Sequence, residues 1–142
     1  MLAGSVVATL AAAPAAQAST THVVSAAQAS GCEVVITSVK ALELQETVND
    51  ETYLKVGDES TKAVKFVEGQ THSGSAFTPA AAIREYIPFG GNVRIQVWEY
   101  DKKDDPDELI GTTYAYCTPG SYHAELKGNG ADYLVKFDVT RA

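Results

Sequence analysis

The sequence predicts an all-β protein: an antiparallel two-sheet β-sandwich of about eight strands, closed by one disulfide. Three observations support this fold class. Short segments such as Val93–Trp98 alternate between apolar and polar residues with the period of two that a half-buried strand requires. Turn residues recur between these segments, as in Gly57–Ser60 and Gly128–Gly130. No stretch keeps a helical period for more than two turns.

Residues 1–18 have the composition of a secretory signal peptide. Leu2–Ala18 is apolar and small, and Ala16-Gln17-Ala18 is a cleavage site before Ser19. The basic segment that normally opens a signal is missing, so we expect the true start to lie upstream. A short buried helix is the alternative, but this stretch has no amphipathic period. We therefore expect a secreted, extracellular protein with no transmembrane segment after signal removal.

Residues 19–31 predict a flexible N-terminal tail that is small and uncharged. Its β-prone pair, Val23 and Val24, is our candidate for partner binding, because such a segment can add to another protein's sheet edge or groove. The alternative is a leader remnant, since Ala26–Ser30 repeats Ala15–Ser19 and offers a second cleavage site at Ala29. Both interpretations stay open from the sequence.

The net charge and the cysteine content limit the classes of partner and the cellular compartment that the sequence is compatible with. The net charge of −7 makes nucleic acid and anionic membranes poor partners unless a cation intervenes. The two cysteines, Cys32 and Cys117, predict one disulfide formed outside the cytoplasm. Closing so long a loop removes roughly 4.5 kcal/mol of unfolded-chain entropy. A reactive thiol would need a nearby base, and neither cysteine has one in the sequence.

The sandwich domain is predicted to span residues 32–142. Its first strand changes phase near Ser38, which indicates a bulge. Gln70–Ser75 has the composition of a loop, and Pro79–Ala82 favours the start of a short helix. The clearest hairpin joins its two last strands across Gly128–Gly130. The predicted strands are Val34–Val39, Thr52–Val56, Ala63–Val67, Arg84–Ile87, Val93–Trp98, Thr112–Cys117, Tyr122–Leu126 and Tyr133–Val139.

The stretch Gly91–Gly111 is the part of the domain that most indicates chemistry. A core strand ends there in an acidic loop, and Leu109 and Ile110 then resume an extended pattern. Five carboxylates fall within eight positions of this loop: Asp101, Asp104, Asp105, Asp107 and Glu108. An acidic loop between two core strands favours a binding function.

The order and spacing of several segments resemble C2 domains. Val34–Leu44 is followed by Asp50–Val56, and Val93–Asp101 is later followed by Asp107–Gly111. In that family two loops together hold calcium. The resemblance therefore implies calcium ligands at Asp50 on the first loop and at Asp101 and Asp107 on the second. Substitute ligands on the second loop are Asp104, Asp105 and Glu108.

The acidic loop also departs from the family pattern. Lys103 stands where C2 domains place a second carboxylate, and the first loop holds one aspartate where a full site has two. Calcium takes six to eight oxygen ligands, and the lysines of this loop would oppose the cation. The alternative is a solvated acidic loop that keeps the sheet edge from pairing. Calcium is therefore the cofactor that the resemblance implies. The alternative expectation is that the protein binds no cofactor.

The layout of the chain is also similar to the small secreted adaptor subunits of actinobacterial umbrella toxin particles. The shared features are the signal Leu2–Ala18, the tail Ser19–Gly31, the Cys32–Cys117 bridge and the Asp50–Val56 strand. The resemblance implies an adaptor that joins a lectin subunit to the helical-repeat stalk of a toxin. It assigns the tail to insertion into the stalk and the β domain to the lectin.

The sequence does not predict an enzyme. His22, His72 and His123 fall in separate segments without metal-ligand spacing, and crowded loop carboxylates do not form an acid/base pair.

Binding residues are expected on the side of the Val93–Trp98 strand that faces away from its valines. Arg94, Trp98 and Tyr100 are residue types that anchor interfaces. The alternative is that Trp98 simply packs, and Tyr114 and Tyr116 carry the same ambiguity. The function predicted is a secreted, non-catalytic adaptor module in an extracellular complex, with calcium-dependent binding to lipid or cell-surface ligands as the alternative.

Overall fold

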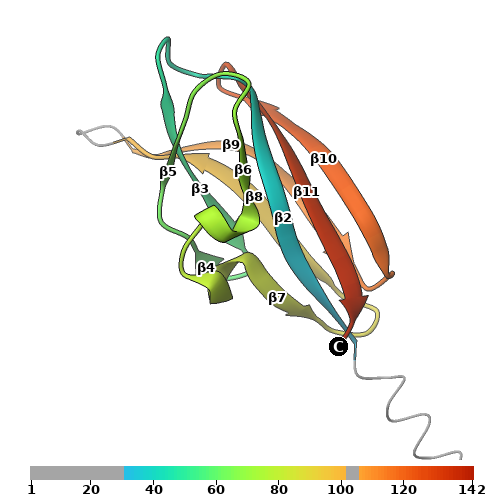
Figure 1. Ribbon diagram of the computed structural model, residues 1–142. Coiled ribbons are helices and arrows are strands. Elements are labelled where there is room, and N and C mark those ends of the chain that lie inside the picture. Colours follow the sequence, from blue (N-terminus) through green and yellow to red (C-terminus); the bar gives the residue numbers. More distant parts are fainter. Residues whose placement is uncertain (1–30, 102–105) are drawn as a thin grey trace, which may run out of the picture. The chain divides into compact units, whose positions relative to one another are not determined.

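The computed structural model describes residues 31–101 and 106–142, which form two antiparallel sheets (Figure 1). The first sheet has the order β10-β11-β2-β6, and β7 also pairs with β2. The second has the order β4-β3-β8-β9, and β5 also pairs with β3. The strands are β2 (Cys32–Glu43), β3 (Asp50–Val56), β4 (Glu59–Ser60), β5 (Val64–Phe66), β6 (Thr71–Ser73), β7 (Arg84–Ile87), β8 (Asn92–Glu99), β9 (Glu108–Tyr116), β10 (Gly120–Gly128) and β11 (Ala131–Arg141).

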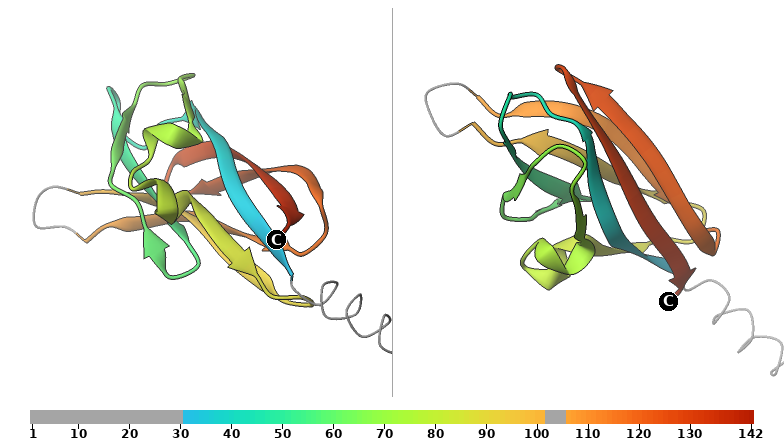
Figure 2. Two further views of the ribbon diagram at one scale, coloured as in Figure 1. Left: turned by 60° about the horizontal axis from the view of Figure 1, so that its bottom comes forward. Right: turned by 45° about the horizontal axis from the view of Figure 1, so that its top comes forward.

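The core lies between the two sheets, which Figure 2 shows from two further directions. Each strand alternates inward and outward side chains, as the period of two requires. In β3, for example, Leu54 and Val56 are buried while Tyr53 and Lys55 are half-exposed. The largest fully buried side chains come from both sheets and the segments between them: Tyr133, Phe66, Phe77, Ile36, Leu54, Ile87 and Ile95. The predicted all-β two-sheet sandwich is confirmed.

A bulge divides β2, as the change of phase near Ser38 predicts. Ser38 pairs with Lys136 and Ile36 pairs with Phe137, so Thr37 has no opposite residue on β11. The inward positions shift accordingly from Ile36 to Val39. The bulge lets one long strand keep its apolar side chains in the core on both sides of the irregularity.

The hairpin between β10 and β11 closes with a two-residue turn. Gly128 pairs with Ala131, and the central residues Asn129 and Gly130 have φ angles of 52° and 82°. Positive φ at both central positions is the geometry that Asn-Gly favours and that matches the twist of the strands. The predicted hairpin is confirmed.

Two predicted loops contain short strands. The described residues therefore form ten strands, where the sequence predicts about eight. Within the predicted loop Gln70–Ser75, Thr71–Ser73 forms β6 and pairs with β2 at Ser38–Lys40. Glu59–Ser60 pairs with the end of β3. The partner of β6 is distant in sequence, so loop composition does not reveal that pairing. In contrast, β4 pairs with the residues that come just before its own turn. The predicted helix start at Pro79 is a 3-10 turn, Ala80–Ile83, with Pro79 as its N-cap.

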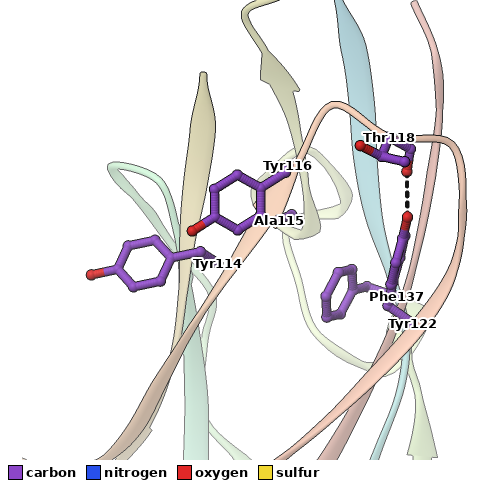
Figure 3. A pocket seen from close by; sticks show the side chains of 6 residues that line it. All are labelled: Tyr114, Ala115, Tyr116, Thr118, Tyr122 and Phe137. Atoms are coloured by element: carbon purple, nitrogen blue, oxygen red, sulfur yellow. Dashed lines mark hydrogen bonds between the residues drawn. The ribbon is translucent and has the colours of Figure 1, made fainter. Parts of the chain in front are cut away.

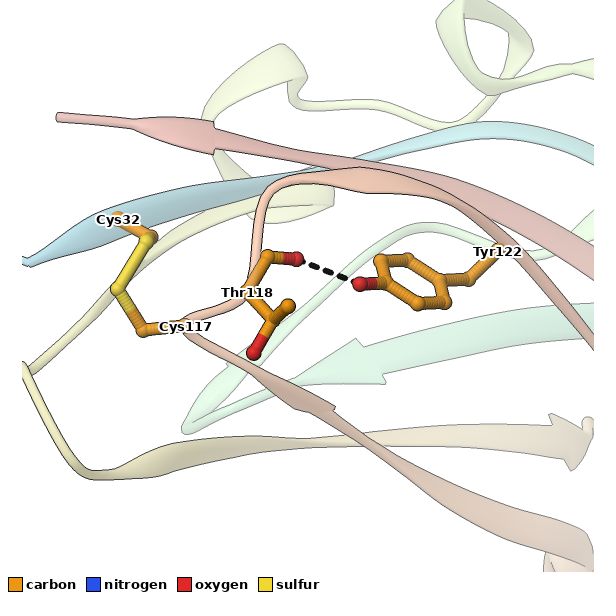
Figure 4. Close-up of a disulfide and its surroundings, with 4 residues drawn as sticks. All are labelled: Cys32, Cys117, Thr118 and Tyr122. Carbon is orange, nitrogen blue, oxygen red and sulfur yellow. Dashed lines mark hydrogen bonds between the residues drawn. A yellow bond between two sulfur atoms is a disulfide. The ribbon is translucent and has the colours of Figure 1, made fainter.

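The predicted disulfide joins Cys32, the first residue of β2, to Cys117, which follows β9 (Figure 4). The two Cα atoms are 5.2 Å apart. Because β2 and β9 belong to different sheets, the bond ties the two layers together at one end of the sandwich. The predicted signal peptide and tail, apart from Gly31, lie outside the described residues. Within 31–101 and 106–142 no helix is long and apolar enough to cross a membrane.

Candidate functional site

The first residue that the C2 resemblance assigns to calcium, Asp50, is fully buried at the start of β3. Its Oδ2 accepts hydrogen bonds from the backbone N–H of Gln45 at 2.8 Å and from the Tyr133 hydroxyl at 2.9 Å. Its Oδ1 accepts one from the backbone N–H of Glu46 at 2.9 Å. The carboxylate therefore fixes the turn between β2 and β3 to the core, a structural role.

The second assigned position, Asp107, closes the base of the acidic loop. Its Oδ2 accepts a hydrogen bond from the Tyr53 hydroxyl at 2.8 Å, and its Oδ1 accepts one from the backbone N–H of Asp101 at 3.0 Å. Burial, and then Asp107 itself, raise the pKa of Tyr53. The structure thus brings Asp101 and Asp107 together, while the fourth assigned residue, Asp104, lies outside the described residues.

A buried glutamate that the sequence analysis did not single out lies near these aspartates. Glu99 ends β8 and is 3% exposed. Burial raises its pKa to about 8, and the negative charges of Glu46, Asp50 and Asp101 add to the increase. No group of three or more His, Cys, Asp or Glu residues in the described ranges is arranged to hold a metal ion.

The outward side of the second sheet carries aromatic, cationic and uncharged polar side chains on neighbouring strands, and we call this surface the aromatic face. Cross-strand pairing fixes its membership, because residues directly opposite each other share a side of the sheet. Tyr53 is opposite Trp98, and Arg94 is opposite Tyr114. The aromatic face consists of Tyr53, Lys55, Arg94, Gln96, Trp98, Thr112, Tyr114 and Tyr116.

Trp98 packs against its neighbours within the aromatic face and is half-buried. Its ring stacks on Tyr53, with centroids 6.3 Å apart and planes at 11°. The Lys55 Nζ lies 4.5 Å from the centroid of the ring, a cation–π contact. The indole N–H donates to the Gln96 Oε1 at 3.1 Å. The sequence left open whether Trp98 packs or faces outward, and the side chain does both.

Arg94, Tyr114 and Tyr116 form the open end of the aromatic face. Tyr114 is 47% exposed and Tyr116 59% exposed, with Ala115 between them buried in the core. Arg94 is exposed and makes no ion pair within 31–101 and 106–142. Tyr100, the third predicted contact residue, is 41% exposed beyond the end of β8. The predicted outward orientation of Arg94, Trp98 and Tyr100 agrees with the alternation of β8.

A cavity of about 330 Å³ opens beside this end, between β9 and β10 (Figure 3). Its lining residues are Tyr114, Ala115, Tyr116, Thr118, Tyr122 and Phe137. The sequence carries no signal of this site. In the sequence Tyr122 and Phe137 are ordinary residues of two predicted strands. The cavity requires two sheet edges to separate, and no local pattern encodes that separation.

The histidines lie apart from these surfaces. His72 packs edge-on against Phe66, and its Nε2 lies 2.9 Å from the carbonyl oxygen of Lys65. His123 is exposed on β10. His22 and the predicted partner-binding pair, Val23 and Val24, lie outside the described residues.

No family model and no curated protein sequence matches this chain. One similar solved structure is described as "Structure of a C2 domain", with 14% identity, 77% of this chain and 96% of that chain covered, and a TM-score of 0.46. Another is described as "CC2D1B coordinates ESRCT-III activity during the mitotic reformation of the nuclear envelope", with 16% identity and a TM-score of 0.50. It covers 80% of this chain and 55% of that chain.

The chain folds as a C2-like β-sandwich. The arrangement of its two sheets and the similarity to the second structure together support this, and at such low identity the likeness concerns the fold alone. The C2-like domain presents two different ends. The acidic residues lie where β3 starts and β8 ends, and the disulfide and the cavity lie where β2 starts and β9 ends.

Proposed function

We propose that this chain is a secreted, non-catalytic binding module that joins other subunits of an extracellular protein complex. The N-terminal tail takes one partner and the aromatic face takes the other. The observation that carries the proposal is the open end of that face, where Arg94, Tyr114 and Tyr116 stand exposed on paired strands. Tyr and Arg are enriched among the residues that dominate binding energies at interfaces.

The rigidity of this surface supports the proposal. Trp98 is held by Tyr53, Lys55 and Gln96, and the Cys32–Cys117 bond ties the neighbouring end of the sandwich together. A surface whose side chains are already ordered loses less conformational entropy when a partner docks. An adaptor between two larger subunits benefits from such a preorganised surface.

The resemblance to the umbrella toxin adaptors suggests which partners to test. The tail with Val23 and Val24 would insert into the helical-repeat toxin stalk, and the β domain would hold the lectin subunit. The complex would serve antagonism between bacteria. The partners to express with this chain are a secreted repeat toxin and a lectin encoded by neighbouring reading frames.

The test measures binding of each partner to the full mature chain and to three double variants. Arg94→Ala with Tyr114→Ala removes a cross-strand pair of the aromatic face. His123→Ala with Lys136→Ala removes an exposed cross-strand pair from the outer side of the other sheet and serves as the matched control. Val23→Ser with Val24→Ser addresses the tail.

We expect the aromatic-face variant to weaken lectin binding by at least about tenfold, the loss typical of an interface anchor. The tail variant is expected to weaken stalk binding, and the control to change neither. Full retention of both partners by all three variants would exclude the proposed division of labour.

Calcium-dependent binding to lipid or cell-surface ligands is the alternative function. The observation that favours it is the crowding of negative charge around Glu99, which a divalent cation would relieve. Against it, Asp50 is fully buried and both oxygens of Asp50 and of Asp107 accept hydrogen bonds from the protein. Calcium-dependent binding is therefore the second candidate function.

A further inference from the structure

The cavity between β9 and β10 is a window that is closed at both ends. β9 and β10 are the edge strands of different sheets. At one end they meet closely, because a Cβ on Gly128 would lie 2.2 Å from the Ile110 carbonyl oxygen and one on Gly111 would lie 2.8 Å from the Leu126 Cβ. At the other end the chain itself connects them through Thr118. A strand cannot run through such an opening, whereas a single side chain can enter it.

The β10 wall of the window is held in place by several contacts. The Tyr122 hydroxyl donates to the Thr118 carbonyl oxygen at 2.6 Å, as Figures 3 and 4 show. The Tyr122 ring stacks on Phe137, with centroids 5.6 Å apart and planes at 24°. Gly120 lies against the same ring, since a Cβ there would be 3.2 Å from the hydroxyl oxygen. The wall is therefore aromatic and already ordered.

The chemistry of the window favours an uncharged, apolar occupant. None of its six lining residues is charged, and Ala115 and Phe137 belong to the buried core. The Tyr122 hydroxyl already donates its proton to Thr118, so it has no second proton to donate to a polar ligand. A volume of about 330 Å³ is near the lower limit of known ligand sites, a size that suits one large side chain.

We propose that the window receives one aromatic side chain of the protein that docks on the aromatic face. Tyr114 and Tyr116 belong to both surfaces, so a partner lying on the face necessarily reaches the window rim. Aromatic rings pair favourably with aromatic walls, and interface anchors tend to fill such pockets at the centre of a contact. The inference rests on the proposed function for the existence of a partner, but the window itself can be tested alone.

The first experiment uses the intact, disulfide-bonded protein and indole as the probe. We expect indole to shift backbone amide resonances of 114–118, 120–124 and 137, and to leave those of 50–56 unchanged. Ala115→Leu fills the window and is expected to weaken indole binding at least tenfold. Glu59→Gln, at an exposed residue of β4 outside both the lining and the aromatic face, is expected to leave it unchanged. Because Ala115 is buried, Tyr122→Ala, on an edge strand, provides a second variant, and it is expected to weaken binding similarly.

The second arm separates an aromatic anchor from a glycan. A soluble oligosaccharide of N-acetylglucosamine is expected to leave the same resonances unchanged. Shifts caused by the oligosaccharide but not by indole would overturn the proposal, as would indole shifts that persist in both folded variants. Loss of lectin binding in Arg94→Ala, a residue of the aromatic face outside the window lining, tests the proposed function separately. The proposed function fails if that loss is absent, and the window fails if indole binding is absent.

Discussion

The Tyr133 hydroxyl of the first sheet donates a hydrogen bond to the fully buried carboxylate of Asp50 in the second sheet, at 2.9 Å. The Thr52 hydroxyl lies 2.8 Å from the same phenol oxygen and donates to it. Burial raises the pKa of Tyr133, with the charge of Asp50 contributing, so the phenol keeps its proton for this bond. The contact joins the two sheets inside the core through polar groups.

Removing the phenol oxygen is therefore expected to destabilise the fold. Tyr133→Phe leaves Asp50 with one donor fewer in a buried position, which costs about 1–3 kcal/mol of unfolding free energy. Urea unfolding of the disulfide-bonded protein measures the loss. Tyr114→Phe, at an exposed phenol, is the matched control and is expected to change stability by less than about 0.5 kcal/mol. Equal losses in the two variants would mean that the inter-sheet bond contributes nothing.

The raised pKa of Glu99 predicts that the free energy of unfolding declines as the pH increases. Its pKa is about 8 in the fold and near the usual 4.5 in the unfolded chain. Between these values the folded protein binds a proton that the unfolded chain has lost. The stabilisation is complete below about pH 4.5 and is lost as the pH rises through 8.

Glu99→Gln removes this titration. We expect the wild-type unfolding free energy to fall between pH 5 and pH 8 by on the order of 1 kcal/mol more than that of the variant. Denaturant titrations of both proteins at pH 5 and pH 8 measure the four unfolding free energies that this comparison needs. Glu59→Gln, at an exposed glutamate of β4, controls for general charge effects. A pH dependence identical in wild type and Glu99→Gln would refute the raised pKa.

The sequence predicts much of this fold because its strands are regular. Alternation alone assigns Arg94 and Trp98 to the outward side of β8, and Asn129-Gly130 defines the last hairpin. The phase change near Ser38 marks a bulge in the strand that the structure contains. These features depend on neighbours within a few residues, so they are visible in the sequence.

The features that the sequence analysis missed depend on contacts between distant segments. Asp50 matches a calcium-ligand position of C2 domains, yet its burial depends on Tyr133, which lies 83 residues away. The window depends on where β9 and β10 meet and where they separate. Tyr122 looks like any alternating strand residue until Phe137 and Thr118 are placed around it.

Calcium binding is expected to be absent at about 1 mM, the concentration at which weak extracellular sites fill. The oxygens of Asp50 and Asp107 already accept hydrogen bonds that hold both loops, and a cation would have to displace them. We expect an unchanged melting temperature and no saturable heat in calorimetry, with magnesium as the control for ionic strength. A saturable heat that Asp101→Asn abolishes would instead establish the calcium-dependent alternative.

The close approach of β9 and β10 at Gly128 predicts that any side chain at this position destabilises the fold. Its φ lies outside the left-handed region, so the cost of Gly128→Ala comes from contact alone. The new Cβ would meet the Ile110 carbonyl oxygen, a backbone atom that moves only if the two strands separate. We expect a loss of about 1–3 kcal/mol in urea unfolding, as for other overpacked sites.

The matched control for this position is Gly91→Ala, whose Cβ would lie 3.3 Å from the Pro88 carbonyl oxygen, at a half-buried position that follows an exposed turn. It is expected to cost less than about 1 kcal/mol. Because Gly128 closes one end of the window, Gly128→Ala is also expected to widen it and to weaken indole binding. A Gly128→Ala protein as stable as wild type would show that the strands do not meet there, and the window would then lack a closed end.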